Sequence, residues 1–448
     1  MLFKPVPNPA RRRNRNGRRA SSELDVAATV RSRDGGGAGR SVASIVFSLE
    51  NSACDLTVAA ARNTSRVSRL PRPSRLLACL LLLGCAAALH GAHPRHGLAT
   101  LPARPLVFGY LNELRTTNSP AWTLSHLDYD AVDLVIHGFA EPKQDGALGY
   151  ELGRFAFYRE PLLDYAHRRG KGVVMSVGGG APERLRDAFA AIAASSARRK
   201  KFAENLLRSV ETWGYDGIDI DYEFPSSARE KSEFTALMQT VHAAFKGAST
   251  NYIVMFGASP GFYIDQFDWA RLAACADFVF YFGYDWKNPA NGPLCNPGAT
   301  QWLSGGFEKI EASTRGALHY ILSRGFPAER LIFGLPFYSS ANDSWPALRE
   351  TWATNRAWFS NAVDAAAGEV RFAGRWWTTP ECVQRKMSSV LDTNSSVLMN
   401  RRTVRGVGFW EFGHQDVTKP DLTGAIKDWF ALRTNVFSAP KNSSSADH

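Results

Sequence analysis

Short apolar runs alternate with amphipathic stretches along the chain from Pro105 to Leu432. Eight of these runs have the length and residue types of buried strands, and they are Leu106–Tyr110, Val132–Phe139, Gly172–Val177, Gly217–Glu223, Tyr252–Gly257, Phe278–Phe282, Leu331–Pro336 and Gly406–Trp410. Helix-like stretches between them include Glu183–Ser195, Arg199–Trp213, Glu230–Phe245 and Phe307–Arg324. Eight strands that alternate with helices over roughly 300 residues predict an α/β fold, a single closed (β/α)₈ or TIM barrel.

A doubly wound open sheet is the alternative for such an alternation. It would be expected to carry a Gly-rich dinucleotide-binding turn after the first strand, and no such turn follows Leu106–Tyr110. The run Gly178-Gly179-Gly180 comes after the third strand and lacks the G-x-G-x-x-G spacing. We therefore predict one barrel domain at residues 105–434.

A long connection at residues 340–405 separates the seventh predicted strand from the eighth. It carries five tryptophans, which are Trp345, Trp352, Trp358, Trp376 and Trp377. We interpret it as a loop-rich excursion on the barrel rim rather than as a second domain.

The positive charge of the chain lies in its first part. Residues 1–104 hold 17 Arg or Lys against 5 Asp or Glu, whereas the rest of the chain holds 36 against 37. The predicted barrel is therefore not a basic nucleic-acid-binding domain, and no nucleic-acid partner is expected. Residues 1–75 are predicted to be a disordered Arg-rich leader, and residues 435–448 a disordered polar tail.

A hydrophobic, signal-like segment is predicted at residues 76–92. Its uncharged apolar run, Leu76–Leu89, follows basic residues and ends in small ones. A membrane-spanning helix needs about 20 such residues, so no stable membrane span is expected, and the pattern favours a secretory signal and a secreted protein. Its distance from Met1 leaves a misassigned start, a long leader or a short signal anchor as alternatives. In a secreted protein, the N-x-Ser sequons at Asn342, Asn394 and Asn442 would be candidate sites of N-linked glycosylation.

Three carboxylates stand at alternate positions in the fourth predicted strand, namely Asp219, Asp221 and Glu223. Alternation with period two places them on one face, each about 6 to 7 Å from the next. Crowding raises the free energy of the ionised forms, so some of these acids hold protons at neutral pH. The pattern favours a proton-transfer site, with a solvated acidic edge or a cation site as alternatives. Asp216 breaks the alternation, so we expect it to have a structural role.

The cysteines do not indicate a metal site. None of the six forms a C-x-x-C pair, so a zinc site has no support in the sequence. We predict neither a metal nor a cofactor.

Several ordered motifs between Pro105 and Leu432 resemble those of glycoside hydrolase family 18, the chitinase family. They are Ser176-Val177-Gly178-Gly179, Asp216–Glu223 with Phe224-Pro225, Phe282-Gly283-Tyr284-Asp285, Leu335-Pro336-Phe337-Tyr338 and Gly408-Phe409-Trp410-Glu411. One position departs from the family pattern, because Phe282 stands where the sixth-strand motif has Met. The resemblance implies a (β/α)₈ hydrolase that uses the N-acetyl group of its own substrate as nucleophile.

The resemblance also implies roles for single residues. Glu223 would be the catalytic acid and base, Asp221 would orient the acetamide, and Asp219 would share a proton with Asp221. Substrate-binding roles would fall to Tyr284, Asp285, Trp410 and Tyr338. Structural support would come from Asp216, Ser176, Gly178 and Gly179.

The expected function is hydrolysis of β-1,4-linked N-acetylglucosamine in chitin or its oligomers by a monomeric enzyme. An endo-β-N-acetylglucosaminidase acting on N-glycan cores would need the same carboxylates and is one alternative. A non-catalytic chitin-binding lectin is the other. Lectins on this barrel typically lose the acid at the position of Glu223, which this chain keeps.

Overall fold

The computed structural model describes residues 95–112, 119–150, 155–180, 182–259, 263–285, 313–364 and 368–433. The predicted leader at 1–75, the signal-like segment at 76–92 and the tail at 435–448 lie outside these residues. Within them, no helix has both the length and the apolar character needed to cross a membrane.

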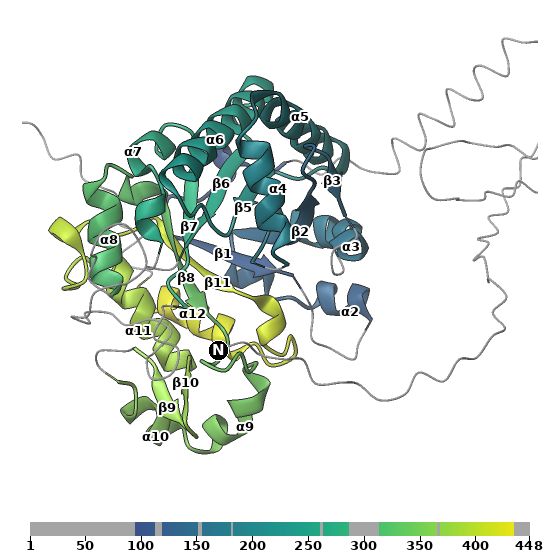
Figure 1. Ribbon diagram of the computed structural model, residues 1–448. Coiled ribbons are helices and arrows are strands. Elements are labelled where there is room, and N and C mark those ends of the chain that lie inside the picture. The colour runs from purple at the N-terminus through teal and green to yellow at the C-terminus, as the bar shows by residue number, and fades with distance from the viewer. Residues whose placement is uncertain are drawn as a thin grey trace, which may run out of the picture. The chain divides into compact units, whose positions relative to one another are not determined.

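Eight parallel strands close into a barrel surrounded by helices (Figure 1). In chain order they are β1 (Leu106–Leu111), β2 (Leu134–Pro142), β4 (Gly172–Gly178), β5 (Gly217–Asp221), β6 (Ile253–Ala258), β7 (Phe278–Tyr281), β8 (Leu331–Pro336) and β11 (Gly406–Trp410). Pairing of β1 with both β2 and β11 completes the ring, and β3 (Leu148–Gly149) adds a short antiparallel pair on β2. Each strand overlaps one predicted run, so the predicted (β/α)₈ barrel is confirmed.

The helices of the outer layer include several that begin at a capping side chain. The helices of this layer are α2 (Pro120–Ser125), α3 (Phe155–His167), α4 (Arg184–Ala193), α5 (Ser196–Trp213), α6 (Ala228–Ala248), α7 (Trp269–Leu272), α8 (Thr314–Ser323) and α12 (Asp421–Ala431). In α5, the Ser195 side chain accepts a hydrogen bond from the backbone N–H of Arg198 and caps the first turn. The helix ends at Gly214, whose φ of 84° suits a left-handed terminating residue.

Strand β5 directs alternate side chains into two different layers. Ile218 and Ile220 are fully buried in the cluster that packs the strands against the helices. Asp219 and Asp221 alternate with them and face the barrel interior, where the inner cluster is largely aromatic and includes Phe280. The period-two pattern in the sequence therefore separates packing residues from acids on one strand.

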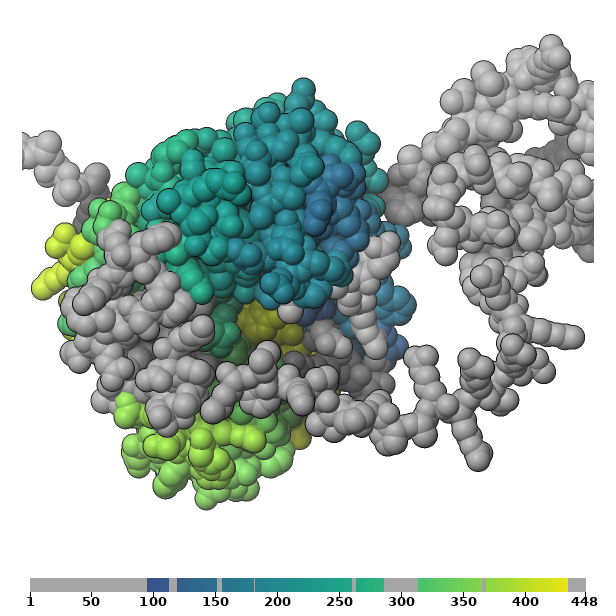
Figure 2. Space-filling view, viewed as in Figure 1, coloured from purple at the N-terminus to yellow at the C-terminus, as the bar shows by residue number. Residues whose placement is uncertain are grey.

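The excursion at residues 340–405 lies between β8 and β11 and contains regular elements. They are α9 (Pro346–Thr354), α10 (Arg356–Asn361), β9 (Val370–Phe372), β10 (Arg375–Trp377) and α11 (Pro380–Leu391). Figure 2 shows part of it, in light green, as a lobe at the lower edge of the described surface. Inside the excursion Lys386 and Glu369 form a fully buried ion pair. The long connection is therefore a packed unit on the barrel rim.

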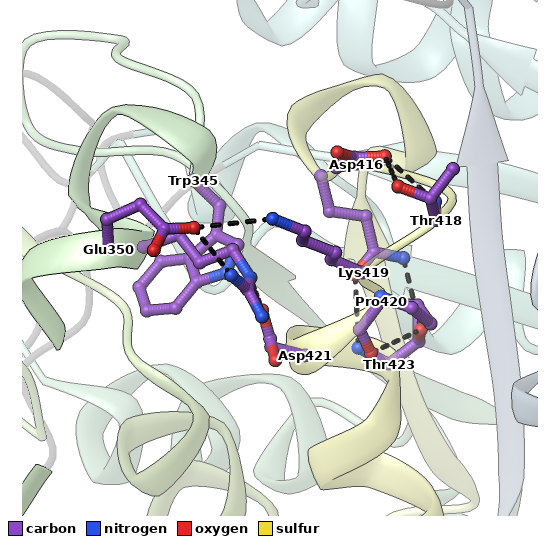
Figure 3. A network of polar contacts seen from close by, with 10 residues as sticks. Trp345, Glu350, Asp416, Thr418, Lys419, Pro420, Asp421 and Thr423 are labelled. Carbon is purple, nitrogen blue, oxygen red and sulfur yellow. Dashed lines mark hydrogen bonds and ion pairs between the residues drawn. The ribbon is translucent and has the colours of Figure 1, made fainter. Parts of the chain in front are cut away.

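Polar contacts attach the excursion to the start of α12 (Figure 3). Asp421 accepts hydrogen bonds from the Arg349 guanidinium over 2.5 Å and from the Trp345 indole over 3.2 Å. Lys419 donates to the Glu350 carboxylate over 3.4 Å. These contacts hold α9 against the barrel helix that follows the last strand.

Residues 95–104 cover the amino-terminal end of the barrel. The backbone N–H of His96 donates to Asp216 over 2.7 Å, and that of Leu98 donates to the Asn251 carbonyl over 2.9 Å. Arg104 forms two hydrogen bonds with Asp133, of 2.9 and 2.8 Å. This segment therefore belongs to the folded unit although it precedes the first strand.

Candidate active site

The three acids predicted on β5 lie at the carboxyl-terminal end of the barrel. Asp219 and Asp221 belong to the strand and are 0% and 2% exposed, and Glu223 follows just after it and is partly exposed. A cavity of about 600 Å³ opens beside them. It is lined by Gly180, Asp221, Glu223, Phe282, Tyr284, Asp285, Tyr338, Ser339, Ser340, Ala341, Asn342 and Trp410.

Asp219 is the deepest of the three acids and is held from two strands, β4 beside it and β1 across the barrel. Tyr110 and Ser176 both donate hydrogen bonds to its Oδ2 atom, over 2.9 and 2.6 Å. Its Oδ1 atom and the Oδ1 atom of Asp221 are buried without a hydrogen-bond partner among the described residues. Burial raises the pKa of Asp219 to about 6, although the two hydroxyl donors act in the opposite direction.

Burial raises the pKa of both outer acids. Burial raises the pKa of Asp221 well above its usual value, and the charges of Glu223 and Asp219 raise it further. Burial, together with the Asp285 carboxylate, raises the pKa of Glu223 to about 8. At pH 7 Asp219 is therefore mostly ionised, while Glu223 has a proton to donate.

Glycines allow the backbone to approach these acids. Gly178 has φ of 120°, and a Cβ atom there would lie 2.1 Å from the Asp221 carbonyl oxygen. Gly179, with φ of 92°, donates its N–H to the same carbonyl over 3.0 Å. A Cβ on Gly180 would lie 2.6 Å from Oε2 of Glu223. A side chain at Gly178 would displace the Asp221 backbone, and one at Gly180 would displace the Glu223 carboxylate, so the Gly run shapes this wall of the site.

Tyr284, Asp285 and Tyr338 form the opposite wall. The Tyr338 hydroxyl donates to Oδ1 of Asp285 over 2.8 Å. The Tyr284 ring stacks on Phe282, with ring centroids 5.3 Å apart, and meets Tyr338 edge to face. Burial and the Asp285 charge raise the pKa of Tyr284 well above its usual value, so its hydroxyl remains a proton donor. Phe282, the departure from the family motif, thus supports the ring of Tyr284.

Trp410 provides a flat aromatic surface at the end of β11. Its ring lies 5.8 Å from that of Phe139, almost parallel to it, and 5.3 Å from that of Tyr110. Tyr110 therefore contacts the floor of the cavity and also holds Asp219. The geometry permits a sugar ring to stack on the half-buried indole.

Asp216 lies at the other end of β5, away from the cavity. It accepts hydrogen bonds from the backbone N–H groups of Val173 and His96, each over 2.7 Å, and contacts His167 over 2.8 Å. Of the predicted site residues, those that line the cavity are Asp221, Glu223, Tyr284, Asp285, Tyr338 and Trp410. Asp219, Ser176, Gly178 and Gly179 support these residues without lining the cavity, and Asp216 lies at the strand's start.

Some residues of the site were not singled out from the sequence, among them Tyr110, Gly180, Gly257 and the turn at 339–342. A Cβ on Gly257 would lie 2.5 Å from Oδ1 of Asp221 and 3.1 Å from the Phe282 ring. The sequence indicates Tyr110 only weakly. The inward-facing positions of the predicted strand Leu106–Tyr110 are apolar up to Tyr110, whose hydroxyl adds a polar group at the end of the strand. Nothing in the sequence indicated the role of Gly257, because it depends on a neighbouring strand.

The chemistry available here is proton transfer with stabilisation of positive charge. Among the described residues, no group of three or more His, Cys, Asp or Glu side chains is placed to hold a metal ion. The site offers a protonated carboxyl, an adjacent buried carboxylate, a tyrosine hydroxyl and an aromatic floor. Such a set suits cleavage of a bond whose transition state gains positive charge.

Comparison with known proteins gives a family match over most of the barrel. Residues 107–414 match the family model described as "Glycosyl hydrolases family 18". A probable endochitinase of Caenorhabditis elegans is 32% identical over 165 residues, which cover 34% of this chain and 26% of that protein. Chitinase 1 of Aphanocladium album is 29% identical over 196 residues, which cover 40% and 43%. The chain thus matches less than half the length of these two relatives.

Solved structures share the barrel. A family 18 chitinase of Cycas revoluta in complex with (GlcNAc)₃ matches with a TM-score of 0.58 and 17% identity, over 72% of this chain and 99% of that one. A chitinase of Trichuris suis matches with a TM-score of 0.60 and 15% identity, over 73% and 100%. At these identities the likeness establishes the fold.

Proposed function

The chain belongs to glycosyl hydrolase family 18, and from this we propose that it hydrolyses β-1,4-linked N-acetylglucosamine in chitin or its oligomers. We further propose a retaining mechanism in which the substrate's own N-acetyl group is the nucleophile and an oxazolinium ion is the intermediate. The observation that carries the proposal is the row of Asp219, Asp221 and Glu223 beside a cavity that also contains Tyr284 and Trp410.

Glu223 is the proposed acid and base. Its pKa of about 8 keeps it protonated at neutral pH, and it lines the cavity at the most exposed end of the row. It can therefore protonate the leaving glycosidic oxygen and later take a proton from the incoming water. The other two acids are fully or almost fully buried, so neither is as well placed to meet the leaving group.

Asp221 and Asp219 are proposed to move a proton within the row. Asp219 is fixed through Oδ2 by Tyr110 and Ser176, which leaves its Oδ1 atom available to share a proton with Asp221. As positive charge develops on the sugar, a proton that shifts inward to Asp219 would place negative charge on Asp221. Asp221 lines the cavity, where it could also accept the acetamide N–H.

Tyr284 and Trp410 are proposed to hold the reacting sugar. The Tyr284 hydroxyl stays protonated, so it can donate to the acetamide oxygen and keep that oxygen directed at the anomeric carbon. Trp410 would stack against the sugar ring from below. With the nucleophile supplied by the substrate, none of the protein carboxylates has to form a covalent bond.

The proposed substrate class is also supported by what related structures bind. The Cycas revoluta chitinase was solved with (GlcNAc)₃, and it shares the barrel on which this cavity is built. Chitin oligomers are therefore the first substrates to try on this chain.

Product analysis on two substrates tests the proposal. The protein should convert chitin oligomers to shorter ones and leave a high-mannose glycoprotein unchanged. Release of glycan from the glycoprotein without cleavage of chitin oligomers would support the endo-β-N-acetylglucosaminidase alternative instead. Binding of oligomers without any cleavage would support the lectin, and the proposed hydrolysis would then be wrong.

A further inference from the structure

The turn at residues 339–344 contains a sequence motif for N-linked glycosylation and forms part of the cavity wall. Asn342 lines the cavity together with Ser340 and Ala341, and its side chain is exposed. Asn342, Asp343 and Ser344 form an N-x-Ser sequon, which is the acceptor sequence for N-linked oligosaccharides in secreted chains. The asparagine that would accept an N-linked oligosaccharide thus lies at the edge of the candidate active site.

The turn is fixed on both sides of Asn342. The backbone N–H of Asn342 donates to the Ser339 carbonyl over 2.8 Å. Asp343 accepts hydrogen bonds from the hydroxyl of Ser339 over 2.6 Å and from the guanidinium of Arg375 over 2.5 Å. These contacts keep the position of the acceptor constant relative to the cavity.

The Asn342 side chain itself takes no part in this network. Its carboxamide makes no hydrogen bond to the described residues, and the residue has φ of 63°, a left-handed conformation that Asn adopts readily. An exposed side chain at the tip of a rigid turn is accessible for attachment of a bulky polar group, and such a group would not disturb the packing of the barrel.

We propose that Asn342 is N-glycosylated when the chain passes through the secretory pathway, and that the attached oligosaccharide narrows the entrance of the cavity. This inference rests on the proposed function and on the predicted secretion. A glycan at this position excludes long polymers more strongly than short oligomers, because a polymer must extend past the rim. Asn394 provides a matched comparison, since it also begins an exposed N-x-Ser sequon but does not line the cavity.

The full chain, Asn342→Gln and Asn394→Gln are each produced in a eukaryotic secretory host and in a bacterial cytoplasm that attaches no glycans. Peptide mass spectrometry measures occupancy of each site. The ratio of kcat/KM on a soluble chitin polymer to kcat/KM on a short oligomer measures access. The bacterial proteins show the effect of each substitution without a glycan, and their hydrolysis of oligomers tests the proposed function separately.

We expect a glycan on Asn342, and a polymer-to-oligomer ratio severalfold lower in the secreted wild type than in secreted Asn342→Gln. The bacterial versions of these two proteins should show a much smaller difference, and Asn394→Gln should leave the ratio unchanged. An unmodified Asn342 peptide, whether or not Asn394 is occupied, overturns the proposed site. An occupied Asn342 with equal ratios in the two secreted proteins overturns the proposed effect on access.

Discussion

The hydroxyl of Tyr110 on β1 donates a hydrogen bond to Oδ2 of Asp219 on β5 over 2.9 Å. These residues are 109 positions apart in the sequence, and the closed barrel places them face to face. Because a donor to a carboxylate stabilises the ionised form, this contact opposes the rise that burial causes in the pKa of Asp219. Tyr110 therefore helps to keep one negative charge in the row of acids.

Tyr110→Phe should shift the acid side of the pH profile upward. In the wild type, kcat/KM should rise as Asp219 ionises near pH 6 and fall as Glu223 loses its proton near pH 8. Loss of the hydroxyl raises the pKa of Asp219, so the acid limb moves to higher pH and the basic limb stays nearly in place. Initial rates between pH 4 and pH 10 measure both limbs. An unchanged acid limb in a folded variant would exclude this role for Tyr110.

Glu223→Gln should abolish hydrolysis and retain binding of oligomers. The amide keeps the size of the side chain but cannot donate the proton, and loss of an acid/base group costs about 10² to 10⁴ in rate. Turnover and calorimetric binding of a chitin oligomer measure the two effects separately. A variant that kept more than about a tenth of the wild-type turnover would contradict the assignment.

Gly257→Ala should lower turnover although it adds only one methyl group. The new Cβ would lie 2.5 Å from Oδ1 of Asp221, so the carboxylate must move. Displacement of a catalytic group by about 1 Å can cost about 100-fold in rate. Gly424→Ala on α12 is the matched control, because a Cβ there meets no atom within 4 Å. Equal kcat values for the two variants would show that Asp221 tolerates the displacement.

Two truncations should differ in stability. Removal of residues 1–92 leaves the contacts of the 95–104 segment with the other described residues in place, so activity and Tm should not change. Removal of residues 1–104 deletes the bonds to Asp216, Asn251 and Asp133, which should cost a few kcal/mol and lower Tm by about 5 °C. Thermal unfolding measures both. If the protein that lacks only residues 1–92 shows a similar decrease in Tm, residues before 92 stabilise the fold.

The sequence predicted the barrel well because each strand is a separate local signal. Apolar runs such as Leu106–Tyr110 and Leu331–Pro336 carry their own strand pattern, and the alternation around Asp219 and Asp221 identified the inward face. The five motifs lie at strand ends, which meet at one end of any parallel barrel. The local pattern therefore predicted the row of acids, whereas the substrate-binding residues, such as Tyr284 and Trp410, were predicted from the family resemblance.

The remaining features depend on contacts between distant segments. Tyr110 became part of the site only because β1 faces β5 across the barrel, and Gly257 only because β6 lies beside Asp221. The excursion contains short helices held by contacts such as Arg349 to Asp421, which local periodicity does not reveal. These features require the register and the packing of the fold.

The configuration of the first product tests the central claim, catalysis by the substrate's own acetamide, most directly. Attack by the acetamide oxygen and then by water gives two inversions, so the new reducing end should be the β-anomer. Proton NMR within the first minutes of hydrolysis of a chitin oligomer, before mutarotation, distinguishes the anomers, and oligomers that lack the N-acetyl group at the cleaved position serve as the control. The account predicts the β-anomer first and no cleavage of the deacetylated position. Initial formation of the α-anomer, or efficient cleavage beside glucosamine, would contradict it.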